Sequence, residues 1–324
     1  MVETKISKID SPYLPQKHAP PPLRIAFIGQ KGLPASWGGI EHHVDEIATR
    51  LAARGHHVTA YVRKWYTQST DKSYKNIRLI TRPTIYTKNL DAGIHSVISS
   101  VDAMARSFDV VHYHGIGPSL FCMMPRITGK KVVATVHRLD YNGKKWGGIA
   151  RAALYWGERS AFCFANAVTV ISLDLEEYYK SRGLSAIYLP SGVIVSQKLS
   201  GAEILQTQYG LKGNDFLLYI GRWDHDKRVR ELVEAFLMLK RPKVKLVVAG
   251  DSNKAIDYRK SVIAAAQSSP DIIFPGYVKG QLKAELLSNA FGFVTASEHA
   301  TLQVFGHRGI LVGLNETGKA PEHS

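Results

Sequence analysis

The chain has 324 residues, of which 45% are hydrophobic and 21% charged, and its formal net charge is +15. This composition excludes a disordered or fibrous protein, and the length predicts two globular domains. No stretch reaches the ~18 apolar residues that a transmembrane helix needs, and the N-terminus lacks the apolar core of a signal peptide. We therefore expect a cytoplasmic protein. Its two cysteines, Cys122 and Cys163, are too few for a disulfide framework or a zinc site, and we expect both to be packed thiols.

Residues 1–23 are predicted to form a flexible leader, because the segment 11–22 holds five of the fourteen prolines. After the leader, short apolar runs alternate with stretches of helical periodicity. This alternation predicts an N-terminal α/β domain at 24–195 with a doubly wound parallel sheet. The predicted strands lie at 24–29, 57–62, 109–113, 131–136, 167–171 and 186–189. The predicted helices lie at 40–54, 91–106, 117–126, 147–165 and 174–182.

A second Rossmann-like domain is predicted at 196–324, after a segment at 190–215 that loses periodicity. Its predicted strands and helices lie at 216–220, 244–249, 272–274 and 291–295, and at 229–239, 258–267 and 281–288. Ligands of such sheets bind outside the carboxyl ends of the strands. We therefore expect the two domains to face each other across a cleft, and the loops that follow the strands are the candidate binding loops.

The loop that follows the first strand is rich in glycine and ends in Gly38 and Gly39, which open the first helix. Bare backbone N–H groups at the positive end of a helix can meet an anion or a sugar oxygen. A dinucleotide fingerprint needs G-x-G-x-x-G at this place and an acid after the second strand, where the chain has Arg63 and Lys64. Binding of NAD is therefore not predicted.

A basic motif, GRWDHDK at 221–227, follows the first strand of the second domain. It places the cations Arg222 and Lys227 beside the start of the next helix. A guanidinium fork combined with a lysine ammonium suits a diphosphate. The alternative interpretation is a solvated, basic helix start without a ligand.

With this motif in place, the chain resembles the retaining glycosyltransferases of family 4, which have the GT-B fold. Within that family it is most similar to bacterial polysaccharide transferases, including rhamnosyltransferases. The resemblance covers about residues 24–299 and rests on KGLPASWGGIEH at 31–42, TVH at 135–137, PSGV at 190–193, the GRWDHDK motif and PGYV at 275–278.

The resemblance implies that a hexosyl group, rhamnosyl among the candidates, moves with retention from a nucleoside diphosphate sugar to a glycan or lipid-linked acceptor in polysaccharide or cell-envelope synthesis. It implies roles for individual residues: Arg222 and Lys227 hold the donor diphosphate, Gly38 and Gly39 allow close approach to the first helix, His137 lies beside the reacting sugar, and Gly276, Tyr277 and Val278 line the base pocket. The alternative for His137 is a structural histidine at a strand end.

Neither a metal nor another cofactor is implied by the resemblance, because arginine and lysine take the role that a divalent cation plays in other transferases. His112 and His114 share one face of a predicted strand, which makes a metal site conceivable. No carboxylate or cysteine lies between them or directly beside them in the sequence, so we do not predict one.

The chain departs from the family after about residue 299. Where the family has two glutamates separated by seven residues, this chain has Ala300 and Arg308. Glu298 is a neighbouring acid that can replace the first glutamate as a catalytic residue, but no second glutamate follows in either register. We therefore expect an incomplete second domain and impaired activity, with the strand at 291–295 exposed as a sheet edge unless residues 310–314 cover it. The alternative is a non-catalytic nucleotide-sugar-binding protein of the same fold.

The positive net charge indicates an anionic partner. Nucleic acid is not predicted, because the chain has no RNP-like, zinc-finger or helix-turn-helix pattern. The segment 62–88 is typical of a surface that binds anionic membranes, because cations and aromatic side chains interleave in it. We therefore expect peripheral association with the inner face of the cell membrane, and the alternative is a solvated loop. The cations are Arg63, Lys64, Lys72, Lys75, Arg78, Arg82 and Lys88, and the aromatic residues are Trp65, Tyr66, Tyr74 and Tyr86.

Overall fold

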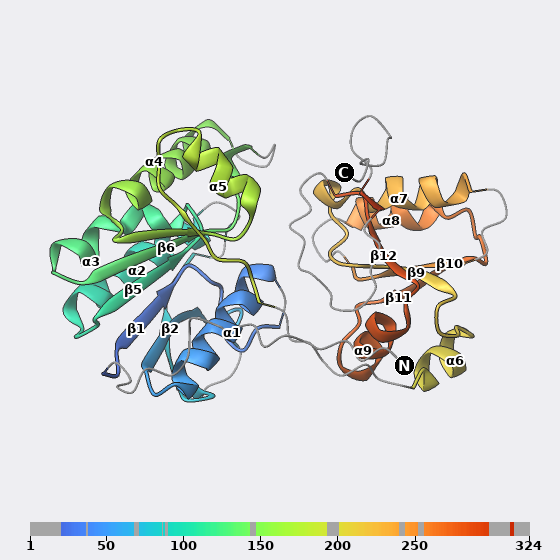
Figure 1. Ribbon diagram of the computed structural model, residues 1–324, viewed down its shortest axis with the longest axis horizontal. Coiled ribbons are helices and arrows are strands. Elements are labelled where there is room, and N and C mark those ends of the chain that lie inside the picture. The colour runs from blue at the N-terminus through green and yellow to red at the C-terminus, as the bar shows by residue number, and fades with distance from the viewer. Residues whose placement is uncertain are drawn as a thin grey trace, which may run out of the picture. The chain divides into compact units, whose positions relative to one another are not determined.

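The structure is a computed structural model that describes residues 21–36, 38–67, 71–85, 87, 90–142, 147–192, 201–239, 244–251, 256–297 and 312–313. The chain divides into two compact units, Met1–Ser191 and Gly192–Ser324. Each unit is built around its own sheet, with helices packed on both faces (Figure 1). This is the architecture of a doubly wound α/β domain.

The first unit contains an eight-stranded sheet in the order β3-β4-β2-β1-β5-β6-β7-β8. All neighbouring strands pair in parallel except β3 and β4, which are antiparallel. The strands are β1 (Arg24–Ile28), β2 (His57–Arg63), β3 (Ser73–Tyr74), β4 (Ile77–Arg82), β5 (Val110–His114), β6 (Lys131–Val136), β7 (Ala167–Val170) and β8 (Ile187–Tyr188). The helices are α1 (Gly39–Ala53), α2 (Asp91–Ala105), α3 (Met123–Ile127), α4 (Gly148–Phe164) and α5 (Leu173–Lys180), with 3-10 turns η1 (Pro118–Phe121) and η2 (Asp140–Asn142).

Strand β1 lies in the middle of this sheet, and its side chains alternate between two cores. Ile25 and Phe27 pack in the core that α1 covers. Ala26 and Ile28 pack in the core that α2 and α4 cover. A strand buried on both faces must be apolar throughout, which explains the continuous apolar run of β1.

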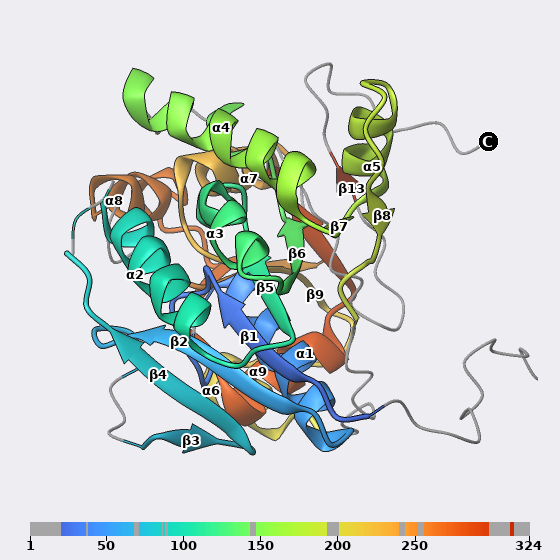
Figure 2. The ribbon, with the colours of Figure 1, turned by 90° about the vertical axis from the view of Figure 1, so that its left-hand side faces the viewer.

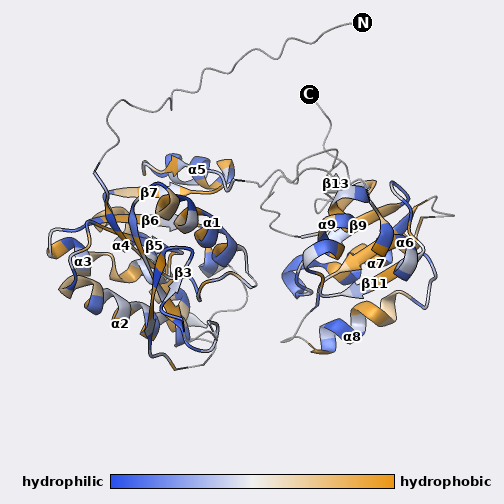
Figure 3. Cartoon of the chain, turned by 90° about the horizontal axis from the view of Figure 1, so that it is seen from below, coloured by the Kyte–Doolittle hydropathy of each residue, from blue (hydrophilic) through white to orange (hydrophobic). Residues whose placement is uncertain are grey.

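The second unit contains a five-stranded parallel sheet in the order β11-β10-β9-β12-β13. One core lies under α7 and α8 and the other under α6 and α9. In Figure 3 the helices of both units show hydrophilic and hydrophobic residues in alternation, as expected for helices with one buried face. The strands are β9 (Phe216–Ile220), β10 (Lys245–Ala249), β11 (Ile272–Gly276), β12 (Gly292–Thr295) and β13 (Val312–Gly313), and the helices are α6 (Glu203–Tyr209), α7 (Val229–Leu237), α8 (Ile256–Ala265) and α9 (Gly280–Asn289), with the 3-10 turn η3 (His225–Lys227).

The predicted α/β class and the doubly wound parallel sheets are confirmed, and β6 and β9 have exactly the predicted bounds. The predicted helix at 117–126 is wrong as one element, because the chain forms η1 and then α3. Pro125 has no N–H to donate to the preceding turn, which explains the break. The segment 190–215 was expected to lack regular structure, but α6 forms there and buries Leu205.

Two further findings concern the edges of the sheets. The basic segment 62–88 contains a hairpin of β3 and β4, joined by Lys75 and Asn76 at φ of 46° and 63°. Strand β13, which is Val312 and Gly313 of the run 310–314, pairs in parallel with β12, as we expected if that run covers the edge. Residues 1–20 of the predicted leader lie outside the described residues. Over the part of the chain that is described, we find no helix with the length and apolarity needed to cross a bilayer.

Candidate functional site

The carboxyl edge of the second sheet gathers the loops that follow β9, β10 and β11. The N–H of Gly221 donates to the carbonyl of Ala249 at 3.1 Å, and the N–H of Gly250 donates to the carbonyl of Gly276 at 2.7 Å. Gly250 has φ of 127°, and a Cβ on it would collide with the carbonyl of Gly221. Only glycine fits there, so the loops run in direct contact along one edge.

Arg222 and Lys227 both lie at this edge of the second unit. The Arg222 side chain is 61% exposed, and its Nη1 atom lies 3.0 Å from Oδ2 of Asp224. The Nζ of Lys227 donates to Oγ of Ser297, which follows β12, at 3.3 Å. The structure therefore brings the two predicted cations to the loops after β9 and β12, where an anion can reach them.

The backbone of Arg222 is fixed by residues that the sequence analysis did not single out. The Tyr219 hydroxyl donates to the Arg222 carbonyl at 2.9 Å. The adjacent Trp223 is buried and packs edge-on against Phe274 of β11, with ring centroids 5.5 Å apart. The loop is therefore anchored on the core side while the guanidinium stays outside. In the sequence, the aromatic residues at 219 and 223 on either side of Gly221 and Arg222 were the available signal that this loop is anchored to the core.

The other predicted donor residues have different surroundings. Tyr277 is 61% exposed, whereas Val278 is buried and packs in the core beside Leu286. Only the backbone of Val278 is therefore available for a ligand. Glu298, the predicted catalytic acid, lies outside the described residues.

The carboxyl edge of the first sheet carries a cluster of buried histidines. His114 ends β5, His137 directly follows β6, and His43 comes from α1. The Nδ1 of His114 lies 3.3 Å from Nε2 of His137, and the rings of His43 and His137 meet edge-on with centroids 4.9 Å apart. Residues 43 and 137 lie far apart in the sequence, and nothing in the local pattern around His43 pointed to this contact.

Burial keeps these imidazoles neutral. It lowers the pKa of His137 to about 3 and that of His112 to about 3, with the neighbouring histidines adding to the effect. Burial also lowers the pKa of His43, and it holds the pKa of His114 well below its ordinary value. A neutral imidazole both donates and accepts hydrogen bonds, so His137 can bind a sugar hydroxyl without carrying a charge.

The same cluster is the one group, within the described residues, that could hold a metal ion. His43, His114 and His137 each offer one ring nitrogen, and these atoms lie within 4.8 Å of one another. Oγ of Ser191 lies 3.0 Å from Nδ1 of His43, and the buried Nε2 atom of His43 has no hydrogen-bond partner among the described residues. His112, which we weighed with His114 for a metal, instead contacts Thr135.

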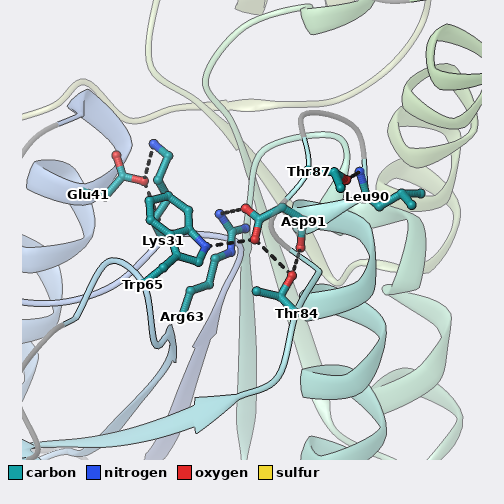
Figure 4. Close-up of polar contacts among 8 residues, drawn as sticks. All are labelled: Lys31, Glu41, Arg63, Trp65, Thr84, Thr87, Leu90 and Asp91. Carbon is teal, nitrogen blue, oxygen red and sulfur yellow. Dashed lines mark hydrogen bonds and ion pairs between the residues drawn. The ribbon is translucent and has the colours of Figure 1, made fainter. Parts of the chain in front are cut away.

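The start of α1 shows why Gly38 is a glycine. Its φ is 102°, and a Cβ on it would collide with the carboxylate of Glu41. Glu41 is 3% exposed and accepts from both the backbone N–H and the Nζ of Lys31, each at 3.1 Å (Figure 4). Gly39 has open space around the position of a Cβ. The glycine-rich loop therefore folds over a buried carboxylate that our sequence analysis did not select.

Beside this loop, Arg63 at the end of β2 forms a buried ion pair. Its Nη1 lies 3.0 Å from Oδ2 of Asp91, the first residue of α2, and its side chain is 3% exposed. Asp91 also accepts from the Trp65 indole N–H and the Thr84 hydroxyl, each at 3.0 Å (Figure 4). Arg63 is therefore structural, and its inclusion in a membrane-binding surface was wrong.

Other members of the basic segment also differ from expectation. Tyr66 is buried, and Arg82 pairs with Asp102. Tyr86 and Lys88 lie outside the described residues. Four of the predicted cations are exposed, namely Lys64, Lys72, Lys75 and Arg78.

The two cysteines differ from each other. Cys122 is buried, as predicted, and burial raises the pKa of its thiol to about 12. Cys163 lies exposed on α4, so its prediction as a packed thiol was wrong.

Comparison with protein families decides what kind of protein this is. The model described as Glycosyltransferase Family 4 matches residues 37–197, and the model described as Glycosyl transferases group 1 matches residues 203–309. The chain is a glycosyltransferase. The second match continues past residue 299, where we expected the resemblance to end. No curated protein matches the chain.

Solved structures agree with this family in fold. HepE from Anabaena, in complex with UDP and glucose, has a TM-score of 0.64 at 16% identity, and the match covers 85% of this chain and 74% of HepE. The catalytic domain of starch synthase IV from Arabidopsis thaliana, bound to ADP and acarbose, has a TM-score of 0.64 at 12% identity, covering 88% and 80%. A UDP-forming α,α-trehalose-phosphate synthase from Burkholderia xenovorans, in complex with glucose-6-phosphate, has a TM-score of 0.59 at 12% identity, covering 90% and 84%. The glycosyltransferase thus has the two-domain, Rossmann-like GT-B fold.

Proposed function

We propose that this glycosyltransferase moves a hexosyl group from a nucleoside diphosphate sugar to a glycan or lipid-linked acceptor with retention, in polysaccharide or cell-envelope synthesis. The donor binds to the domain at 196–324 and the acceptor to the domain at 24–195. Rhamnosyl is one candidate for the transferred group, because the resemblance includes rhamnosyltransferases. Neither a metal nor another cofactor takes part in this proposal.

The observation that carries the proposal is the pair of cations at the carboxyl edge of the second sheet. Arg222 and Lys227 both follow β9, and the Lys227 side chain contacts Ser297 after β12, at the edge where ligands of such sheets bind. A nucleoside diphosphate leaves as an anion, and preorganised cations stabilise that charge in the transition state. HepE binds UDP and UDP-glucose, and the starch synthase domain binds ADP, which supports a nucleotide donor here.

The acceptor-side residues in this proposal lie at the carboxyl edge of the first sheet. His137 is 8% exposed, so only a small part of its neutral ring can meet a sugar hydroxyl. Gly38 and Gly39 open α1 close to the ion pair of the half-buried Lys31 with the buried Glu41. These groups offer hydrogen bonds to a polar, hydroxyl-rich ligand, and they fit a glycan better than an apolar one.

Product analysis tests the reaction. The protein is incubated with UDP-, GDP- and dTDP-sugars, and release of the nucleoside diphosphate and the anomeric proton signal of the product are followed by NMR. We expect release of a nucleoside diphosphate and a product with the anomeric configuration of the donor. An inverted product contradicts retention. Donor binding without turnover favours the alternative, a non-catalytic nucleotide-sugar-binding protein.

We also infer that the protein works in the cytoplasm and associates peripherally with the inner face of the cell membrane. A lipid-linked acceptor is held at a bilayer, so an enzyme that docks there meets it at high local concentration. Lys64, Lys72, Lys75 and Arg78 remain exposed in the basic segment, and each cation near an anionic bilayer favours binding. Flotation with anionic and with neutral vesicles tests this inference, and binding only to the anionic vesicles is expected.

A further inference from the structure

Helix α4 has an aromatic and apolar outer face that the rest of its unit does not cover. Ile149 is 91% exposed, Trp156 is 63% exposed and Tyr155 is 41% exposed. Ala152 and Cys163 are exposed as well. At 3.6 residues per turn, Ile149, Ala152, Trp156 and Cys163 fall on one stripe of the helix. We call this stripe, together with Tyr155, the outer face of α4.

The opposite side of α4 packs against its own unit. The helix therefore already buries one face, and the outer face is a second one. Leu154 packs in the core. A Cβ on Gly157 would collide with the carbonyl of Ile116, which shows how closely the helix approaches the unit. Glu158 is 6% exposed and accepts from the hydroxyls of Tyr141 at 3.1 Å and Tyr179 at 2.8 Å. These contacts fix the rotation of the helix about its axis.

The charges of α4 differ in exposure. Glu158 is the single acid of the helix and it points inward. The two cations, Arg151 and Arg159, are exposed. Arg159 donates through Nη2 to the Tyr155 hydroxyl at 2.9 Å, and its guanidinium lies 5.3 Å from the centre of that ring. The exposed side of α4 therefore combines tryptophan, tyrosine and isoleucine with positive charge and without an acid.

We propose that the outer face of α4 docks on an anionic lipid surface, with Ile149 and Trp156 entering the headgroup layer and Arg159, which lies beside the stripe, contacting lipid phosphates. Tryptophan and tyrosine favour the interface, and a helix that lies flat in it needs an apolar face flanked by basic residues. A second copy fits less well, because pairing the two outer faces would bring their arginines together. Figure 2 shows α4 running along the outside of the unit, with α3 packed beneath it.

This inference deepens the membrane association proposed above and rests on it, and it assigns the docking to a helix outside the basic segment 62–88. Its tests measure binding to vesicles, which does not depend on sugar transfer. Failure of the wild-type protein to bind anionic vesicles would contradict both statements. Binding that survives changes in α4 and is lost when Lys72 and Arg78 are changed would contradict the assignment to α4 alone.

The two cysteines allow a direct test. A thiol-reactive, polarity-sensitive fluorophore is expected to label the exposed Cys163 and to leave the buried Cys122 unlabelled. Vesicles of phosphatidylglycerol and phosphatidylcholine should shift the emission of the labelled protein to shorter wavelength, and phosphatidylcholine vesicles should not. The control is Cys163→Ser combined with Met238→Cys, which moves the label to a position that is 81% exposed on the second unit. Equal shifts at both positions would overturn the proposal.

Flotation of unlabelled variants measures the same contact. Arg159→Gln should weaken binding to anionic vesicles about fivefold, since each cation near the surface contributes roughly a factor of five. Ile149→Ser with Trp156→Ser should weaken it at least about tenfold, whereas Met238→Ser, which removes another exposed apolar side chain, should leave it unchanged. Unchanged flotation of the α4 variants would overturn the proposal. A dimer that dissociates in Ile149→Ser with Trp156→Ser, seen by light scattering, would also overturn it and make this face a self-association surface.

Discussion

The Nδ1 atom of His114 lies 3.3 Å from the Nε2 atom of His137, so the last residue of β5 holds the ring of the residue that follows β6. One of these nitrogens must donate and the other accept. Burial lowers the pKa of both rings, which keeps them in the neutral form that such a bond requires. The orientation of the proposed sugar-binding imidazole is therefore set by a residue beneath it.

Replacing His114 should affect turnover through the position of His137. His114→Leu removes the hydrogen bond and should lower kcat about fivefold, which corresponds to a loss of ~1 kcal/mol. His114→Asn is the matched control, because its amide can place a polar atom near the position of Nδ1, and it should retain more activity. Steady-state kinetics with a saturating donor measures both variants. Equal kcat values for the two variants would contradict the positioning role.

Stability should fall on mild acidification. The pKa of His137 and of His112 is about 3 in the folded protein and that of His95 about 4, all because of burial. An unfolded histidine titrates near its ordinary pKa of about 6.5. The free energy of unfolding is therefore highest above pH 6.5 and decreases as the pH falls below it, by up to about 1.4 kcal/mol per pH unit for each histidine.

Urea unfolding between pH 7 and pH 5 measures this dependence in a range where the carboxylates stay ionised. His137→Asn should make the slope shallower by about one proton. A free energy of unfolding that does not change over this range would contradict the burial of neutral histidines.

The buried ion pair of Arg63 and Asp91 should contribute more to the free energy of unfolding than an exposed ion pair does. Asp91→Ala leaves the guanidinium of Arg63 buried without its partner, and this should cost about 3–5 kcal/mol of unfolding free energy. Glu46→Ala breaks an exposed pair with Arg50 on α1 and should cost no more than about 1 kcal/mol. Chemical denaturation of both variants provides the comparison. Similar losses in the two variants would be evidence against a special role for the Arg63 pair.

Asp224 should compete with the donor for Arg222. Its Oδ2 atom lies 3.0 Å from the Arg222 guanidinium, which is the group expected to bind diphosphate. Asp224→Asn removes this competing anion while keeping the side-chain shape, so UDP should bind about two- to fivefold more tightly, as expected for an exposed ion pair. Weaker binding by this variant would show that Asp224 positions Arg222 for the ligand. Calorimetric titration decides between the two results.

The sequence predicted interior strands of both sheets well, because β6 and β9 are short, mainly apolar runs that are buried on both faces. It missed the hairpin of β3 and β4, since the exposed charges of this segment masked the alternation of Ile77 and Leu79. Asn76, a residue type that tolerates the positive φ found at this turn, was the local sequence signal for that hairpin.

The candidate site could be predicted where one loop carries it and not where distant elements build it. Arg222 and Lys227 lie within one motif, and both reach the edge where the sequence placed them. The contact of His43 with His137 depends on how α1 packs against the sheet, which no spacing in the chain reveals. For Arg63 the sequence predicted a surface role that the structure does not support. A basic residue in a basic segment gives no sign that it forms a buried ion pair with Asp91.

The most direct test of the account is calorimetric titration of UDP and other nucleoside diphosphates against the intact protein and three variants. Arg222→Ala and Lys227→Ala should each weaken binding about 10- to 150-fold, since a charge-assisted contact contributes ~1.5–3 kcal/mol. Arg230→Ala removes an exposed cation of α7 that pairs with Glu234, and it should leave the affinity unchanged. Unchanged affinity in the first two variants, or an equal loss in all three, would contradict a donor site at the carboxyl edge of the second sheet.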